Sequence, residues 1–156
     1  MCEQANRLEL IKEAYRLSEM RLAGEAQAAS VSDQRAATFC AGALAVAGLL
    51  TGLFDPATPN YGLLISATLL LIATVVAGYA LRPRDFYFPG AAYSDFAEDI
   101  SGNVAVSKVL SQMGDFNDTH SHSNAKVLHD NAKLTSIAFG LAMIALLIAI
   151  ITQWIV

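Results

Sequence analysis

Three long stretches without a charged side chain dominate this sequence. They cover residues 36–53, 61–81 and 135–156, which are 18, 21 and 22 residues long. The hydrocarbon core of a bilayer is about 30 Å thick, and a helix needs roughly 20 residues to cross it. Only 15% of the 156 residues are charged, whereas a soluble domain carries about 25%. Burial of all three stretches inside a water-soluble protein is disfavoured, because the rest of the chain is too short to cover them. The sequence therefore predicts three transmembrane helices.

The positions of the basic residues predict the orientation of these spans. All ten lysines and arginines lie either before the first stretch or between the second and the third. Cytoplasmic flanks of membrane spans are enriched in Lys and Arg. We therefore expect a membrane protein with its N-terminus in the cytoplasm, its C-terminus outside and the lipid bilayer as a partner.

The ends of the predicted spans carry residues that suit a membrane interface. Pro83 lacks an N–H group and is expected to end the second span. Residues 54–60 contain two prolines and no basic residue, so the first two spans should form a hairpin. Arginines and aromatic side chains near span ends sit well at headgroup depth. The predicted interface anchors are Arg35, Arg82, Arg84, Phe86, Tyr87 and Trp154.

The remaining segments are predicted to form helices in the cytoplasm. Residues 1–35 alternate apolar and charged positions with helical spacing, and nothing between them and the first span breaks a helix. We favour one continuous helix over two. In the second segment, residues 82–134, we expect an irregular start, a turn at Pro89–Gly90, a helix from near Ser94, an amphipathic helix over 104–113, a loop or helix interruption over 114–124, and a helix that feeds the third span. The predicted fold is all-α, a polytopic membrane protein with three transmembrane helices (36–53, 61–81, 135–156) and a cytoplasmic helical bundle.

Small residues recur four positions apart within the spans. Such spacing lets helices approach closely in lipid, although alanine is common enough here that some pairs arise from composition. The expected packing residues are Gly48, Gly52, Ala73, Ala77, Ala138, Ala142, Ala145 and Ala149. They predict a tightly packed bundle and a homo-oligomer. The spans contain no ionisable Asp, Glu, Lys, Arg or His, which argues against ion-coupled transport but not against a pore with an apolar gate.

One segment carries possible metal ligands. His120 and His122 lie near each other, and His129 follows seven residues later, about 10 Å along a helix. Because this spacing is poor for zinc, we favour a solvated polar segment without a metal or cofactor. The chain has no phosphate-binding glycine loop, paired-cysteine site or nucleophile elbow. We expect no enzymatic activity and no nucleic-acid partner.

Two short motifs carry a family resemblance. Residues 32–37, SDQRAA, open the first span, and residues 82–90, RPRDFYFPG, follow the second. In these motifs and in its layout the chain resembles the small helical membrane effectors of bacterial anti-phage defence, the SLATT and Pycsar-type groups, although its third span departs from a plain two-span effector. The resemblance implies an oligomer of the bacterial inner membrane that forms or gates a pore, with cytoplasmic helices that sense a protein or small ligand. The alternative is a non-conducting membrane anchor that recruits a soluble partner.

Overall fold

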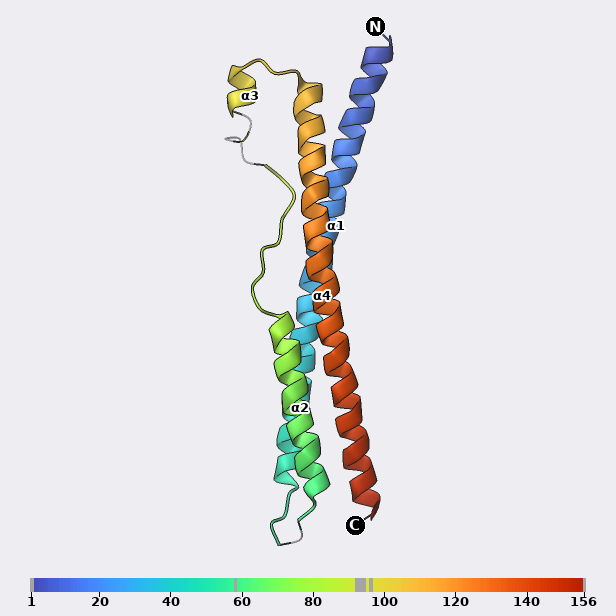
Figure 1. Ribbon diagram of the computed structural model, residues 1–156, viewed down its shortest axis with the longest axis vertical. Coiled ribbons are helices and arrows are strands. Elements are labelled where there is room, and N and C mark those ends of the chain that lie inside the picture. Colours follow the sequence, from blue (N-terminus) through green and yellow to red (C-terminus); the bar gives the residue numbers. More distant parts are fainter. Residues whose placement is uncertain (1, 58, 92–94, 96, 156) are drawn as a thin grey trace. The chain divides into compact units, whose positions relative to one another are not determined.

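The computed structural model describes residues 2–57, 59–91, 95 and 97–155. Four helices appear in chain order: α1 (Cys2–Gly52), α2 (Tyr61–Ala80), α3 (Ala97–Ser101) and α4 (Val106–Ile155) (Figure 1). Every regular element within these described residues is a helix. The predicted all-α class is therefore confirmed.

Three of the helices are long and apolar enough to cross a membrane. They are α1, α2 and α4, and each covers one of the predicted charge-free stretches except for its last residue. The prediction that the N-terminal helix runs without a break into the first of these stretches is confirmed, because α1 is one helix of 51 residues. The breaker-rich segment after it separates α1 from α2, as the hairpin prediction requires.

The loop or interruption predicted over residues 114–124 is wrong, because α4 is one continuous helix of 50 residues. The polar residues there do not break the helix, because the hydrogen bonds of their side chains are compatible with a continuous α4. Thr119 and Ser123 donate to carbonyl oxygens one turn earlier in α4. Asn117, Ser121 and Asn124 are instead turned toward α1. A helix is expected to start near Ser94, but Ser94 itself lies outside the described residues. The helix that can be placed in this region is α3, which begins at Ala97.

The chain divides into two compact units. Unit 1 comprises Met1–Ala29 and Asp85–Val127, and unit 2 comprises Ser30–Arg84 and Leu128–Val156. The helices α1 and α4 each contribute residues to both units, whereas α2 belongs to unit 2 and α3 to unit 1.

Unit 2 is held together by an alanine-rich core between α1, α2 and α4. Small side chains at the contact allow the three backbones to approach closely, which favours dispersion contacts along each helix. Phe39 and Phe139 pack against each other beside this core, with ring centroids 4.4 Å apart. The core residues are Ala43, Ala47, Leu50, Leu63, Ala67, Leu70, Ala73, Ala142, Ala145 and Ala149.

The first turn of α2 is fixed against the end of α4. The Asn60 side chain accepts a hydrogen bond from the Gly62 amide at 3.1 Å and donates one to the Thr152 carbonyl at 3.4 Å. The first contact is an N-cap, which satisfies a free donor of the helix. A Cβ atom at Gly62 would lie 2.5 Å from the Cβ and Oγ1 atoms of Thr152. Glycine at this position is therefore required by the close approach of the two helices.

We expect Gly62→Ala to destabilise unit 2 by about 1–3 kcal/mol through this overlap, despite the better helix propensity of alanine. Thermal unfolding of the purified protein in detergent, followed by circular dichroism, measures the effect. The matched control is Gly78→Ala in the same helix, where nothing lies within 4 Å of the added methyl group. An equal response of the two variants would contradict the α2–α4 contact.

Candidate functional site

Unit 1 contains a buried polar contact between α1 and α4, and it is centred on Glu25. The Glu25 carboxylate accepts hydrogen bonds from the Ser121 hydroxyl at 2.5 Å and from the Asn124 amide at 3.3 Å. Both donors are buried, and the Glu25 side chain is 15% exposed. Arg21 lies 3.4 Å from the same carboxylate and supplies an opposite charge. Because buried polar groups are costly unless paired, this network specifies how α1 and α4 face each other.

A second polar contact lies further along the same two helices. The Asn117 amide donates to the Ser18 hydroxyl at 2.9 Å, and that hydroxyl donates to the Tyr15 carbonyl at 2.7 Å. Residues 117, 121 and 124 are spaced four and three apart, so they lie on one face of α4. This face is polar and meets α1.

The extended segment that follows α2 is fastened to α4 in unit 1. We call residues 85–88 the strap. The Tyr87 amide donates to the Asn124 side-chain oxygen at 3.0 Å, and the Asn124 amide donates back to the Tyr87 carbonyl at 2.9 Å. The Tyr87 ring stacks on the His120 ring, with centroids 3.7 Å apart and an interplanar angle of 8°. Phe116 meets the same imidazole edge-on at 3.9 Å. One buried asparagine therefore joins α1, α4 and the strap.

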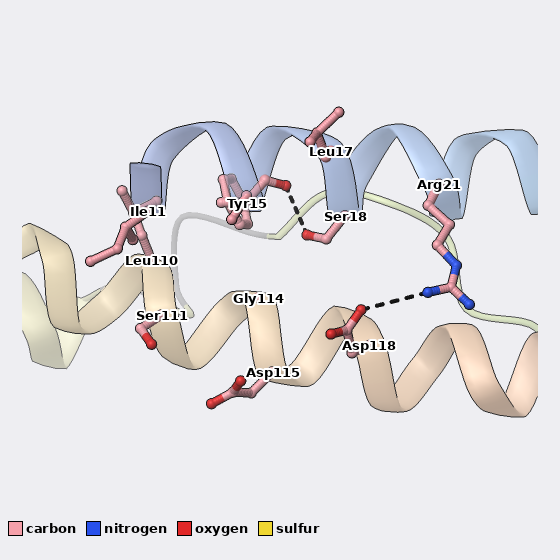
Figure 2. A pocket seen from close by; sticks show the side chains of 11 residues that line it. Ile11, Tyr15, Leu17, Ser18, Arg21, Leu110, Ser111, Gly114, Asp115 and Asp118 are labelled. Atoms are coloured by element: carbon pink, nitrogen blue, oxygen red, sulfur yellow. Dashed lines mark hydrogen bonds and ion pairs between the residues drawn. The ribbon is translucent and has the colours of Figure 1, made fainter. Parts of the chain in front are cut away.

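An open groove runs between α1 and α4 in unit 1 (Figure 2). Its volume is about 380 Å³. Arg21 and Asp118 point toward each other across it, with charged atoms 3.9 Å apart (Figure 2). Both side chains are more than half exposed, so solvent screens this pair and it adds little stability. The groove is lined by Ile11, Ala14, Tyr15, Leu17, Ser18, Arg21, Leu110, Ser111, Gly114, Asp115 and Asp118.

Tyr15 on the groove wall is the titratable group with the largest shift in this unit. Burial first, and then a hydrogen bond to the Glu19 carboxylate together with its negative charge, raise the pKa of Tyr15 to about 12. All three causes favour the neutral phenol. Since the pKa in the folded chain lies above the ordinary value of about 10, the contribution to stability is fully present below pH 10. It is lost as the pH rises through 12.

We predict that Tyr15→Phe removes a tyrosinate absorbance step near pH 12 from an alkaline titration of the folded protein. Glu19→Gln should move that step toward pH 10, because it removes the negative charge beside the phenol. Ultraviolet absorbance of the tyrosinate between pH 9 and 13 measures both effects. Tyr61→Phe serves as the control, since Tyr61 lies in unit 2 and is exposed. A titration of Glu19→Gln that matches the wild type would contradict the Tyr15–Glu19 contact.

The predicted interface anchors take different positions in the structure. Arg82 lies with its guanidinium 4.0 Å from the centre of the Tyr79 ring, and Arg84 reaches the Asp130 carboxylate at 3.5 Å. Tyr87 is the anchor that the structure places in the contact with Asn124 and His120. Arg35 and Trp154 are exposed and Phe86 is half-buried.

The predicted packing residues fall into two groups. Six alanines are buried in unit 2: Ala73, Ala77, Ala138, Ala142, Ala145 and Ala149. Gly48 and Gly52 are exposed, and nothing in the chain lies within 4 Å of a methyl group built on either.

The three histidines have different surroundings in the structure. His120 lies between two aromatic rings, while His122 and His129 are exposed on α4. Within the described parts of the chain, no group of three or more His, Cys, Asp or Glu side chains is placed to hold a metal ion.

Sequence reasoning missed the contact around Asn124. The polar spacing of residues 117, 121 and 124 indicates one helical face and would have pointed to α4. The stacking of Tyr87 on His120 leaves no such signal, because it joins segments 33 residues apart.

No protein-family model, curated protein or solved structure matches this chain.

Proposed function

We propose that this protein is a non-enzymatic, oligomeric inner-membrane protein whose spans form or gate a conducting pathway. In this proposal unit 1 is a cytoplasmic helical bundle that responds to a protein or a small ligand, and defence against phage is the biological setting that the family resemblance suggests. One observation carries the proposal. The helices α1 and α4 each supply residues to both the polar unit 1 and the apolar unit 2. A change in how α1 and α4 pack in unit 1 can therefore bias the packing of the same two helices in unit 2.

The alanine core supports a pathway between chains rather than within one. Ala73, Ala138 and Ala145 are fully buried, and small side chains from α1, α2 and α4 fill the centre of unit 2. A packed core of this kind holds few voids larger than a water molecule. Ions would then pass between copies of unit 2, where apolar surfaces can gate by dewetting.

The placement of the basic residues supports the orientation. With all ten lysines and arginines before the first span or between the second and third, the proposal places unit 1 in the cytoplasm and the C-terminus outside.

Ion flux in liposomes tests the proposal. Purified protein is reconstituted in vesicles loaded with a potassium-sensitive dye, and flux is compared with empty vesicles and with vesicles that contain Ala145→Leu. Flux that depends on the protein and on its intact core supports the pathway. No flux from a protein that forms closed oligomers, with lipid filling the centre of the ring, would contradict it.

The open groove of unit 1 favours a second candidate, a non-conducting anchor that recruits a soluble partner. Its rim carries the exposed Leu17 side chain, which a partner helix can cover. Stoichiometry separates the two candidates, because a monomer or dimer bound to one larger protein fits the anchor and a closed ring fits the pathway.

A further inference from the structure

The two sides of the strap contact in unit 1 differ in character. On one side lie Asn124 and His120, which both belong to the helix α4. On the other side lies an extended segment outside every helix, and its residue Tyr87 makes the hydrogen bonds and the ring contact. Tyr87 is 41% exposed, whereas Asn124 is fully buried. The arrangement is that of a short extended peptide bound on a helical surface.

The helical side of this contact is oriented without help from the strap. The Asn124 amide donates to the Glu25 carboxylate at 3.3 Å, and Ser121 donates to the same carboxylate at 2.5 Å. Because an ionised carboxylate only accepts hydrogen bonds, Glu25 determines which end of the Asn124 carboxamide turns toward it. Phe116 lies one turn before His120 on α4 and contacts the imidazole edge-on at 3.9 Å. Both groups that hold the strap are therefore positioned by neighbours on α1 and α4.

Asn124 binds the main chain of residue 87 and not its side chain. Its oxygen accepts from the Tyr87 amide at 3.0 Å, and its NH2 group donates to the Tyr87 carbonyl at 2.9 Å. Every residue except proline offers this pair of groups. In an extended chain the two groups of one residue point to the same side, as they do between antiparallel strands. The contact therefore selects an extended segment, as strand addition to a sheet edge does.

The His120 ring adds a preference for an aromatic side chain. The Tyr87 ring stacks on it with centroids 3.7 Å apart, and stacking uses the flat face that Phe, Tyr and Trp share. Phe116 is 63% exposed although it contacts the same imidazole. Apolar ring surface therefore remains open beside the site, and an occupant longer than the strap can cover it.

We propose that Asn124, His120 and Phe116 form a recognition site for an extended peptide segment with an aromatic residue. The strap occupies this site within the chain, and a segment of a partner protein takes its place. The proposal rests on the proposed function, in which unit 1 responds to a partner. A tethered strap competes at an effective concentration of the order of millimolar. The partner segment must therefore make contacts beyond those of Tyr87, and the open surface of Phe116 offers them.

Peptide binding to a variant with a weakened strap tests this site. Tyr87→Ala removes the stacked ring of the strap and leaves the helical side of the contact unchanged. The probe is a fluorescent peptide of residues 85–90, DFYFPG, and fluorescence anisotropy follows its binding to the full chain in detergent. A site that is closed most of the time binds with reduced apparent affinity. We expect the peptide to bind Tyr87→Ala about fivefold more tightly than the wild type, or better. Equal affinity for the two proteins would overturn the proposal.

Two altered peptides separate the main-chain contact from the ring contact. One has alanine in place of the tyrosine and lacks the ring. The other has N-methyltyrosine, which keeps the ring but lacks the N–H group that Asn124 accepts. Each should bind Tyr87→Ala at least about fivefold more weakly than the unaltered peptide. One common affinity for the three peptides would indicate adsorption without recognition and would overturn the site.

Two double variants locate the binding on α4. Asn124→Leu, combined with Tyr87→Ala, removes the main-chain partner. His120→Ala in the same background removes the stacking surface, and it takes no part in the hydrogen bonds to Glu25, so it stays informative if Asn124→Leu unfolds unit 1. Both should weaken peptide binding about fivefold or more, with the helix content checked by circular dichroism. The matched control is His122→Ala, because His122 is exposed on α4, and it should leave the affinity unchanged. Equal binding by the His120 and His122 variants would contradict the site.

Displacement of the strap is measured in the wild type. Peptide at millimolar concentration should speed hydrogen exchange of the Tyr87 amide about fivefold, because the displaced strap loses its Asn124 partner. Unchanged exchange with the peptide bound would overturn the shared site.

Ion flux in liposomes separates this site from the proposed function. Peptide binding that requires His120, from a protein that gives no flux, supports the site and contradicts the conducting pathway. Flux from a protein that binds the peptide in neither form overturns the site and leaves the pathway intact.

Discussion

Ala145→Leu is expected to destabilise unit 2 by about 3 kcal/mol or more, at the upper end of the cost of overpacking a core. Ala145 is fully buried on α4, and the residues around it in the core include alanines from both α1 and α2. A leucine adds three carbon atoms where neighbouring side chains are as small as a methyl group. Because packed interiors hold few voids, the helices must separate to admit it. Loss of monodisperse protein on heating in detergent, followed by size-exclusion chromatography, measures the change.

The matched control for this prediction is Ala37→Leu. Ala37 lies on α1 in the same unit, and its side chain is exposed. The same change of chemistry at this position should shift the unfolding midpoint only slightly, since exposed substitutions away from special contacts cost within about 0.5 kcal/mol. Equal loss of stability in the two variants would show that α4 does not use its alanine face for packing.

The prediction of three long apolar helices is confirmed, and it depends on one strong physical signal. Charged side chains are excluded from the centre of a bilayer, so the charge-free stretches mark where the helices are apolar regardless of their tertiary contacts. The core residues Ala73 and Ala145 follow from the same stretches, because small residues four apart share a face. The buried alanines of α2 and α4 therefore lie where the spacing predicts them.

Gly48 and Gly52 illustrate where spacing alone is ambiguous. The two are four residues apart, as are the buried alanines Ala73 and Ala77, yet they lie on the outer face of α1. Spacing identifies a face but does not say which neighbour covers it. The structure resolves the question, because Ala43 and Leu50 are buried in the core of unit 2 and both glycines are exposed.

The prediction of a loop or helix interruption over residues 114–124 was wrong for a different physical reason. Asn, Asp and Ser favour turns because their side chains compete for backbone hydrogen bonds, and a composition of this kind ordinarily indicates a loop. Here Asn117 and Ser121 have partners on α1, Ser18 and Glu25. Once a polar side chain is engaged across a helix contact, it no longer competes with its own backbone. Tertiary contacts thus override the local preference.

Asn124→Leu is expected to release the strap and to weaken the contact of α1 with α4 in unit 1. Leucine has a similar volume but removes one acceptor and two donated hydrogen bonds, which leaves the Tyr87 amide, the Tyr87 carbonyl and the Glu25 carboxylate without these partners. Each buried polar group that loses its partner costs about 1–3 kcal/mol. Tyr87 is 41% exposed, so water replaces part of the loss at its backbone. The expected total is therefore about 2–4 kcal/mol.

Proteolysis and hydrogen exchange measure this change locally. Chymotrypsin cleaves after Phe86 or Tyr87 only when the strap leaves its site, and cleavage tracks the open population. A loss of about 2–4 kcal/mol raises that population about 30-fold or more, and the Tyr87 amide should exchange faster by a similar factor. The control is Ser123→Ala, which removes an exposed hydroxyl bonded only within α4. If Asn124→Leu and Ser123→Ala are cleaved at the same rate as the wild type, Asn124 does not hold the strap. The strap would then have to be held by the stacking of Tyr87 on His120.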